Sequence, residues 1–261
     1  MSELLEFAKD LALRAGSLLR AGQSGYLEIR HKTAQDLVTD QDVKAERFIV
    51  HAIRERFPDH GILAEESGEH QVSDGTWRWL IDPLDGTTNY VHRWPHWSVS
   101  LALEHAGVVV LGVIYAPVCG ELFWAERGTG AYQNGKRMQV TATTELRQAL
   151  IATVSLFKVW RKPGDRPPLG RLLSSAFKVR QTGCASLDLA WLAAGRLDAC
   201  CQVNILPWDV AAGNLLVEEA GGRIISLVGA PFNLLLDTAL LASNDVINDQ
   251  MVALLTDPAD G

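Results

Sequence analysis

The chain has 261 residues, 48% of them hydrophobic, and a net charge of −7. This length is enough to bury a large core in one domain or in two closely packed subdomains. No stretch approaches the roughly 20 consecutive apolar residues that span a bilayer. The acidic N-terminal sequence MSELLEFAKD does not have the form of a signal peptide. No run of Lys or Arg exceeds two residues, which argues against a nucleic-acid-binding surface. We therefore expect a cytoplasmic protein without membrane or nucleic-acid partners.

Two helices are predicted in the first part of the chain. Apolar residues from Leu4 to Leu19 recur at spacings of three and four, which predicts a helix over residues 3–21. A second helix is expected to begin near Asp40, a favourable N-cap residue, and to end before Pro58.

Consecutive strands joined by short turns follow these helices. The expected strands are Trp77–Ile81, Ser98–Glu104, Val108–Tyr115 and Glu121–Glu126. Asn134-Gly135 is typical of a tight hairpin turn. The pattern indicates an antiparallel meander.

After about Val140 the pattern alternates between strand and helix. The expected strands are Ala149–Ser155, Leu197–Val203, Arg223–Val228 and Ala239–Ala242, and the expected helices are Leu187–Ala194, Asp209–Ala220 and Asp245–Leu255. We therefore predict an α+β, layered α/β sandwich with an antiparallel meander half (1–140) and a strand–helix alternating half (141–261). A cleft is expected between the two halves.

The four cysteines are Cys119, Cys184, Cys200 and Cys201. They form neither a CxxC pair nor a Cys/His metal-binding spacing. We expect reduced thiols, mostly in the core. If Cys200 and Cys201 lie on a strand, their side chains point to opposite faces.

The sequence WLIDPLDGTTNY at residues 79–90 places Asp82 and Asp85 three residues apart. Pro83 biases Asp82 towards an extended conformation, so we expect the strand to end there and a turn to bring both carboxylates to one side. Two ionised carboxylates in contact require a cation, and oxygen ligands suit Mg²⁺ or Mn²⁺. Taken alone, an ordinary Asp-Gly turn with an incidental second acid explains the stretch equally well.

Gly86, Thr87 and Thr88 follow directly. Glycine allows a ligand to approach the backbone closely. The threonines favour a helix start, where free N–H groups attract an anion. The stretch thus predicts metal ligands followed by a phosphate-binding position.

Further acids could complete such a site. Glu65 and Glu66 come after the short apolar run Gly61–Ala64, at an expected strand end. Asp209 begins a predicted helix, where an N-cap role explains it as well. Asp36, Asp40 and Asp42 cluster before the second helix, where helix capping and a solvated face explain Asp36 and Asp40.

The chain resembles the inositol monophosphatase family of Mg²⁺-dependent, lithium-sensitive phosphomonoesterases. Four ordered motifs carry the resemblance over nearly the whole chain: DLVTDQD (36–42), AEES (64–67), WLIDPLDGTTNYVH (79–92) and PWDVAAGNLLVEEAGG (207–222). The last two are long and specific. The resemblance implies the family's layered sugar-phosphatase fold and homodimers.

The resemblance also implies two or three Mg²⁺ ions per site. Glu65, Asp82 and the Leu84 carbonyl would bind a first ion. Asp82, Asp85 and Asp209 would bind a second, with Asp82 bridging the two ions. Two ions can stabilise both the attacking and the leaving oxygen of a phosphate ester.

Catalytic and substrate contacts follow from the same resemblance. Thr87 would hydrogen-bond Asp42 and, with Glu65, orient the attacking water, while the N–H groups of Gly86 and Thr87 would hold phosphate oxygens. The predicted contacts with the sugar are Gly183, Cys184, Ala185, Gln202 and Asp209. Gln202 departs from the family pattern, because inositol-hydrolysing members commonly carry Glu there. A neutral amide gives up a charge-assisted contact, and this leaves the exact sugar open.

The predicted activity is hydrolysis of a small sugar or polyol phosphate, and myo-inositol monophosphate is the leading candidate substrate. Histidinol phosphate, 3′-phosphoadenosine 5′-phosphate and fructose 1,6-bisphosphate stay open as substrates. A protein that uses this fold chiefly to bind another macromolecule is the alternative from a different functional class. The complete acidic set Glu65, Asp82, Asp85 and Asp209 favours catalysis, since a pure binding protein would not need all four.

Overall fold

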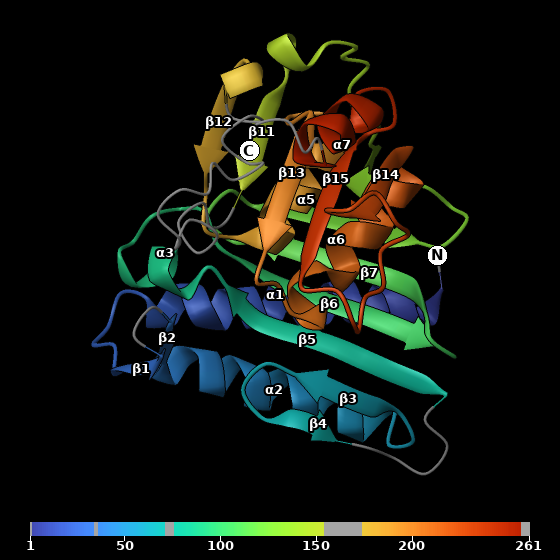
Figure 1. Ribbon diagram of the computed structural model, residues 1–261. Coiled ribbons are helices and arrows are strands. Elements are labelled where there is room, and N and C mark those ends of the chain that lie inside the picture. The colour runs from blue at the N-terminus through green and yellow to red at the C-terminus, as the bar shows by residue number, and fades with distance from the viewer. Residues whose placement is uncertain (1, 34–35, 71–75, 154–173, 257–261) are drawn as a thin grey trace.

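The protein is described by a computed structural model, which covers residues 2–33, 36–70, 76–153 and 174–256 (Figure 1). Helices and sheets alternate in layers: α1 and α2, a large sheet, α5 and α6, a small sheet, and α7. The predicted layered α+β sandwich is confirmed. Within the described residues, no helix is long and apolar enough to cross a membrane.

The large sheet is an antiparallel meander with two strands added at one edge. Its strands lie in the order β10 (Lys136–Arg137), β9 (Ala131–Gln133), β8 (Glu121–Glu126), β7 (Val108–Ala116), β6 (Ser98–His105), β5 (Trp77–Asp85), β3 (Gly61–Ala64) and β4 (Gly68–His70). Neighbours from β5 to β10 are antiparallel, as predicted, whereas β3 runs parallel to β5. Asn134 and Gly135 both have positive φ and form the predicted hairpin turn.

The small sheet has mixed strand directions. Its order is β12 (Lys178–Gln181), β11 (Leu150–Thr153), β13 (Ala199–Val203), β15 (Ala239–Asn244) and β14 (Gly222–Ser226). β11 runs parallel to β12 and β13, while β15 is antiparallel to β13 and β14. The large sheet thus lies within residues 1–140 and the small sheet within 141–261; a division into two domains at this point stays a prediction.

The helices close the layers. α1 (Glu3–Gly22) and α2 (Asp40–Arg56) pack on the outer face of the large sheet, beside the short hairpin of β1 (Ile29–Thr33) and β2 (Asp36–Thr39). α5 (Ala185–Ala193) and α6 (Pro207–Glu219) lie between the sheets, and α7 (Asn248–Thr256) packs against the small sheet. The remaining elements are the short helix α3 (Thr87–Val91) and the 3₁₀ turn η1 (Leu146–Gln148).

The sequence explains how closely α6 approaches the large sheet. A Cβ atom at Gly112 on β7 would lie only 2.9 Å from the Cα of Ala212 on α6. Glycine and alanine therefore let the two backbones meet, so that α6 is held at a fixed depth between the sheets. This helix carries Asp209 in its first turn.

The cysteine predictions are confirmed. All four thiols are free; Cys119 is exposed and the other three are buried. On β13, Cys200 packs into the cluster between the sheets, and Cys201 packs into the cluster beneath α7.

Candidate active site

Strand β5 continues to Asp85. The prediction that this strand ends before Pro83 was therefore wrong. Asp82 pairs with Ser100 on β6 and Asp85 pairs with Ser98, so β5 holds one residue more than its partner between these pairs. This β-bulge accommodates Pro83, which cannot donate a ladder hydrogen bond. The two acids are thereby positioned by a sheet strand rather than by a loop.

Gly86 turns the chain from β5 into α3. Its φ is +89°, and a Cβ atom there would lie 3.0 Å from the carbonyl oxygen of His96, so glycine is required for both reasons. Thr87 begins the helix, as predicted. Its Oγ1 lies 3.0 Å from Asp42 Oδ1 and 3.1 Å from the Leu84 carbonyl oxygen, and it can donate to either.

Asp42 is buried in the first turn of α2. Its Oδ2 accepts hydrogen bonds from the N–H (2.8 Å) and Oγ1 (2.5 Å) of Thr39. The N-cap of α2 is therefore Thr39 rather than Asp40, and Asp42 completes a capping box. Burial raises the pKa of Asp42, against the hydrogen bonds from Thr39. Asp42 thus links the N-terminal end of α2 to Thr87 through hydrogen bonds.

Glu65 reaches the site from β3. Because β3 runs parallel to β5 and Ala64 pairs with Ile81, Glu65 lies beside Asp82. The ammonium group of Lys32, from β1, contacts Glu65 Oε1 (2.8 Å) and Glu66 Oε1 (2.5 Å). Burial nevertheless raises the pKa of Glu65 to about 7, with Lys32 opposing the shift.

Asp82 is buried, with only 2% of its surface exposed. Its Oδ1 accepts the N–H of Leu84 at 2.9 Å. Burial raises its pKa well above the ordinary value, and the negative charges of three further acids, Glu65, Asp85 and Asp209, raise it again. The structure therefore brings together the four acids that the sequence singled out.

Asp85 is held by the start of α5. Its Oδ2 accepts the N–H (2.7 Å) and Oγ (2.6 Å) of Ser186 and the thiol of Cys184 (3.2 Å). Burial raises the pKa of Asp85, and the Ser186 hydrogen bonds oppose that shift. Cys184 is buried, and burial together with the charge of Asp85 raises its pKa well above the ordinary value. Of the three residues predicted as a substrate loop, Gly183, Cys184 and Ala185, it is Cys184 that contacts Asp85, and Ala185 begins α5.

Asp209 occupies the first turn of α6, where its Oδ2 accepts the N–H of Leu206 at 2.8 Å. The N-cap of α6 is Leu206, so the N-cap role considered for Asp209 from the sequence was wrong. Its capping role is that of the third helical residue, whose carboxylate accepts the N–H of the N-cap. It does not exclude a part in the acidic cluster, since the charge of Asp209 is one of those that raise the pKa of Asp82.

Gln202 is fully buried on β13, and its amide nitrogen donates to Asp188 Oδ2 at 3.0 Å. Asp188, also fully buried, accepts from Thr182 Oγ1 at 2.5 Å and lies 3.2 Å from His96 Nε2. Sequence reasoning missed this carboxylate. A single acid within the apolar stretch of α5 was the available signal, because buried charge requires partners.

The chemistry of these acids, rather than their present arrangement, suits a hard divalent cation. The available ligands are carboxylate oxygens and the Leu84 carbonyl oxygen, which are the ligand types that Mg²⁺ prefers. The Asp82 contacts described above are with the Leu84 N–H and with other acids, and none of them is with a cationic side chain. Among the described residues, no three His, Cys, Asp or Glu side chains are already arranged as a metal cluster. Glu65, Asp85 and Asp209 instead contact Lys32, Ser186 and the Leu206 N–H, respectively. All the Asp85 side-chain contacts given above go to Oδ2, which leaves Oδ1 for a cation.

Asp82→Asn is expected to stabilise the metal-free protein, and to do so increasingly as the pH rises. A raised folded pKa costs nothing below about pH 3.8, where the group is neutral in both states. Above that pH only the unfolded state releases the proton, so wild-type stability falls. Thermal and urea unfolding in EDTA should show a small gain near pH 4 that rises to more than about 1.4 kcal/mol at pH 8, the equivalent of one pKa unit.

Asp10→Asn, at an exposed position on α1, is the control and should change stability by less than about 0.5 kcal/mol. An equal effect of Asp82→Asn at pH 4 and pH 8, or a loss of stability, would contradict the description of a repulsive acidic cluster.

Gln202→Glu is expected to destabilise the protein, because it places a second buried carboxylate against Asp188. The expected cost at pH 8 is about 1–3 kcal/mol. Adding Asp188→Asn exchanges the positions of amide and carboxylate and should recover at least half of it. A double-mutant cycle in urea measures this coupling; strictly additive costs would show that the two side chains do not interact.

Comparisons with known proteins agree with this arrangement. The family model described as "Inositol monophosphatase family" matches residues 1–258. An inositol-1-monophosphatase from Caulobacter vibrioides is 40% identical over 239 residues, which cover 90% of this chain and 93% of that protein. The Nus factor SuhB of Escherichia coli K12 is 38% identical over 260 residues, covering 98% and 97%.

A solved structure gives the same result. The extragenic suppressor protein suhB from Bartonella henselae superimposes with a TM-score of 0.92 at 35% identity, covering 98% of this chain and all of the other. Sequence and structure therefore agree over almost the full length: this chain belongs to the inositol monophosphatase family.

Proposed function

We propose that the protein hydrolyses a small phosphate monoester with Mg²⁺, and that myo-inositol monophosphate is its substrate. The observation that carries the proposal is the group of four acids around buried Asp82, beside the turn from β5 into α3. Family membership supports a phosphatase. Phosphate monoesters hydrolyse extremely slowly without a catalyst, so an enzyme for this reaction must provide a large rate enhancement.

In this proposal two or three Mg²⁺ ions bind to oxygen ligands. Glu65, Asp82 and the Leu84 carbonyl would hold one ion, and Asp82, Asp85 and Asp209 would hold the next. When bound, such ions neutralise substrate charge and lower the pKa of a water molecule. Lys32 contacts Oε1 of Glu65, so the ion would either bind the other carboxylate oxygen or replace Lys32. An acidic protein can thus bind a phosphate ester without a basic cleft.

The chain's own groups then orient the reactants. The N–H groups of Gly86 and Thr87 hold phosphate oxygens. Thr87 and Glu65 orient the attacking water, and Asp42 holds the Thr87 hydroxyl in place through the 3.0 Å contact. No nucleophilic Ser or Cys is required, and buried Cys184, whose pKa is raised, is suited to lining the site rather than to attack.

Substrate selection is assigned to the loop Gly183, Cys184 and Ala185 together with Gln202 and Asp209. Because Asp188 accepts the amide N–H of Gln202, this position offers a neutral group in a fixed orientation. Because Gln202 is fully buried, a sugar hydroxyl would reach it only after a local rearrangement, and would then meet a weaker partner than a carboxylate. Histidinol phosphate, 3′-phosphoadenosine 5′-phosphate and fructose 1,6-bisphosphate are therefore tested beside inositol phosphates.

The proposal also covers the localisation, oligomeric state and partners of the enzyme. It describes a cytoplasmic, lithium-sensitive homodimer that does not bind nucleic acid, consistent with the net charge of −7. A second candidate is a role in binding another macromolecule, since several relatives are named Nus factor SuhB. The intact acidic set favours catalysis over this candidate.

Phosphate release is expected from at least one inositol monophosphate, and only with Mg²⁺. The panel also contains glycerol 2-phosphate, histidinol phosphate, 3′-phosphoadenosine 5′-phosphate and fructose 1,6-bisphosphate. Asp82→Asn should lower kcat by a factor of about 1,000 or more, because Asp82 is proposed to contact both ions, while far-ultraviolet circular dichroism stays unchanged.

Each substrate is measured with Mg²⁺, with EDTA and with the Asp82→Asn variant. Near-full activity of that variant would contradict the metal assignment. A preference for another monoester would keep the mechanism and change the substrate. No turnover by folded protein on any substrate would favour the macromolecular role, and capture of a partner by the Asp82→Asn protein would then test it.

A further inference from the structure

Two buried side chains, Asn89 and Asp188, hold the same two residues through different groups. The amide nitrogen of Asn89 donates to the main-chain carbonyls of His96, at 2.6 Å, and Thr182, at 2.8 Å. The Asp188 carboxylate contacts the side chains of those two residues, accepting from Thr182 Oγ1 at 2.5 Å and lying 3.2 Å from His96 Nε2. Asn89, His96, Thr182 and Asp188 therefore form a closed network, which we call the clamp.

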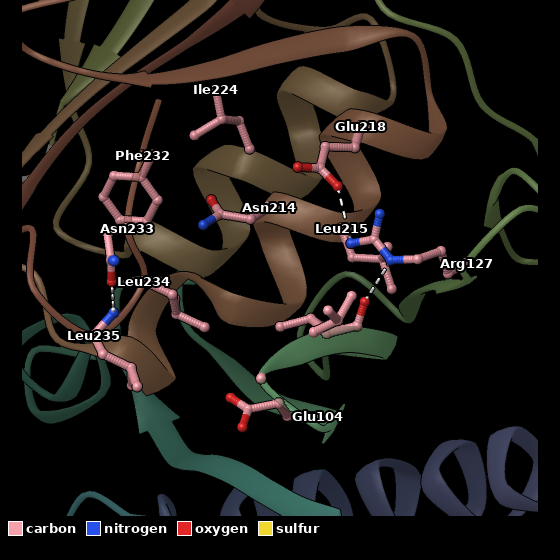
Figure 2. A pocket seen from close by; sticks show the side chains of 13 residues that line it. Glu104, Arg127, Asn214, Leu215, Glu218, Ile224, Phe232, Asn233, Leu234 and Leu235 are labelled. Atoms are coloured by element: carbon pink, nitrogen blue, oxygen red, sulfur yellow. Dashed lines mark hydrogen bonds and ion pairs between the residues drawn. The ribbon is translucent and has the colours of Figure 1, made fainter. Parts of the chain in front are cut away.

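The clamp differs from the surface ion pairs of the protein. Figure 2 shows one of these, in which Arg127 donates to Glu218 at 3.0 Å. Their side chains are 43% and 47% exposed, and exposed pairs contribute little to stability. Asp188 is instead fully buried, and Asn89 and His96 are also buried. Losing one contact of a buried network leaves a polar group without a partner, which is costly. The clamp is therefore a rigid connection.

One end of the clamp lies at the turn that is proposed to hold phosphate. Asn89 belongs to α3, whose N-cap is Gly86. A Cβ atom at Gly86 would lie 3.0 Å from the carbonyl oxygen of His96, which is the same oxygen that Asn89 binds. The clamp thus fixes the segment against which this turn packs.

The other end of the clamp lies at the loop that is proposed to contact the sugar. Thr182 directly precedes Gly183, and a Cβ atom at Gly183 would lie 3.4 Å from the Asn89 amide nitrogen. Asp188 lies in α5, and its main-chain N–H donates to the Cys184 carbonyl at 3.2 Å. The loop is therefore tied to the clamp on both sides.

We propose that Asn89 and Asp188 are positioning residues that hold the sugar loop (Gly183–Ala185) at a fixed place relative to the phosphate turn (Gly86–Thr87). This fixed spacing makes the enzyme select its substrate by the alcohol half of the monoester. The inference rests on the proposed phosphatase function. Both side chains are buried, so they act through the residues that they hold. A loop that is already ordered costs no binding energy to order, and small misplacements of a bound substrate reduce its turnover strongly.

Thr182→Val tests the clamp, because it keeps the shape of the side chain and removes the hydroxyl that Asp188 accepts. For the preferred sugar or polyol phosphate of the panel above, kcat/KM should fall about 10-fold or more. p-Nitrophenyl phosphate has no hydroxyl on its alcohol half, and inorganic phosphate occupies the phosphate position alone. The kcat/KM of the first and the inhibition constant of the second should change by less than about twofold.

Three further variants locate the effect. Thr182→Ser retains the hydroxyl and should restore the selectivity of the wild type. Asn89→Ser removes the carbonyl contacts without altering Asp188, and should give the same pattern as Thr182→Val. Thr153→Val is the matched control, since the Thr153 hydroxyl is buried on β11 and has no hydrogen-bond partner within the described residues. It should leave all three constants unchanged.

Equal losses of kcat/KM with the sugar phosphate and with p-nitrophenyl phosphate, in folded variants of an active enzyme, would show a general structural role and overturn the inference. Unchanged selectivity in Thr182→Val or in Asn89→Ser would overturn it as well, and either variant suffices if only one folds. No turnover by the wild type on any substrate would contradict the proposed function and the inference together, so the two failures are distinguishable.

Discussion

Asp82 lies where water is excluded and where three further carboxylates raise its pKa. Like charges in such a place repel one another strongly, because the low local dielectric screens them little. Either the acids take up protons or a cation binds among them. Elements from both halves of the chain hold this unfavourable arrangement together, and the proposed function follows from the cation that would relieve it.

The fold sustains the repulsion by bringing the four acids from three rigid elements. Asp82 and Asp85 come from the bulged end of β5, Glu65 from the end of β3, and Asp209 from the first turn of α6. α6 in turn is fixed by its close contact with β7 at Gly112. Displacing one acid would require breaking a sheet or a helix packing contact, so the carboxylates cannot simply move apart.

Much of this was predictable from local patterns. The helices, the meander and the hairpin follow from periodicity and turn residues, and the acidic set follows from WLIDPLDGTTNY and the other motifs. The end of β5 was predicted wrongly, because a proline normally ends a strand pairing and the bulge that accommodates it depends on β6. The N-cap of α2 was displaced by one residue, since Thr39 competes with Asp40 for that role.

Long-range contacts could not be read from the sequence. Lys32 meets Glu65, and Asp188 meets Gln202 and His96, only because the fold brings together elements far apart in the chain. No local pattern encodes such pairs.

The central claim is that the acids around Asp82 bind divalent cations. Crystals grown with Mn²⁺ and measured near the manganese absorption edge test it most directly. The account predicts anomalous peaks within coordination distance of Asp82, one shared with Glu65 and one with Asp85 and Asp209. Well-ordered crystals with Mn²⁺ peaks only elsewhere, or with none at these carboxylates, would contradict it.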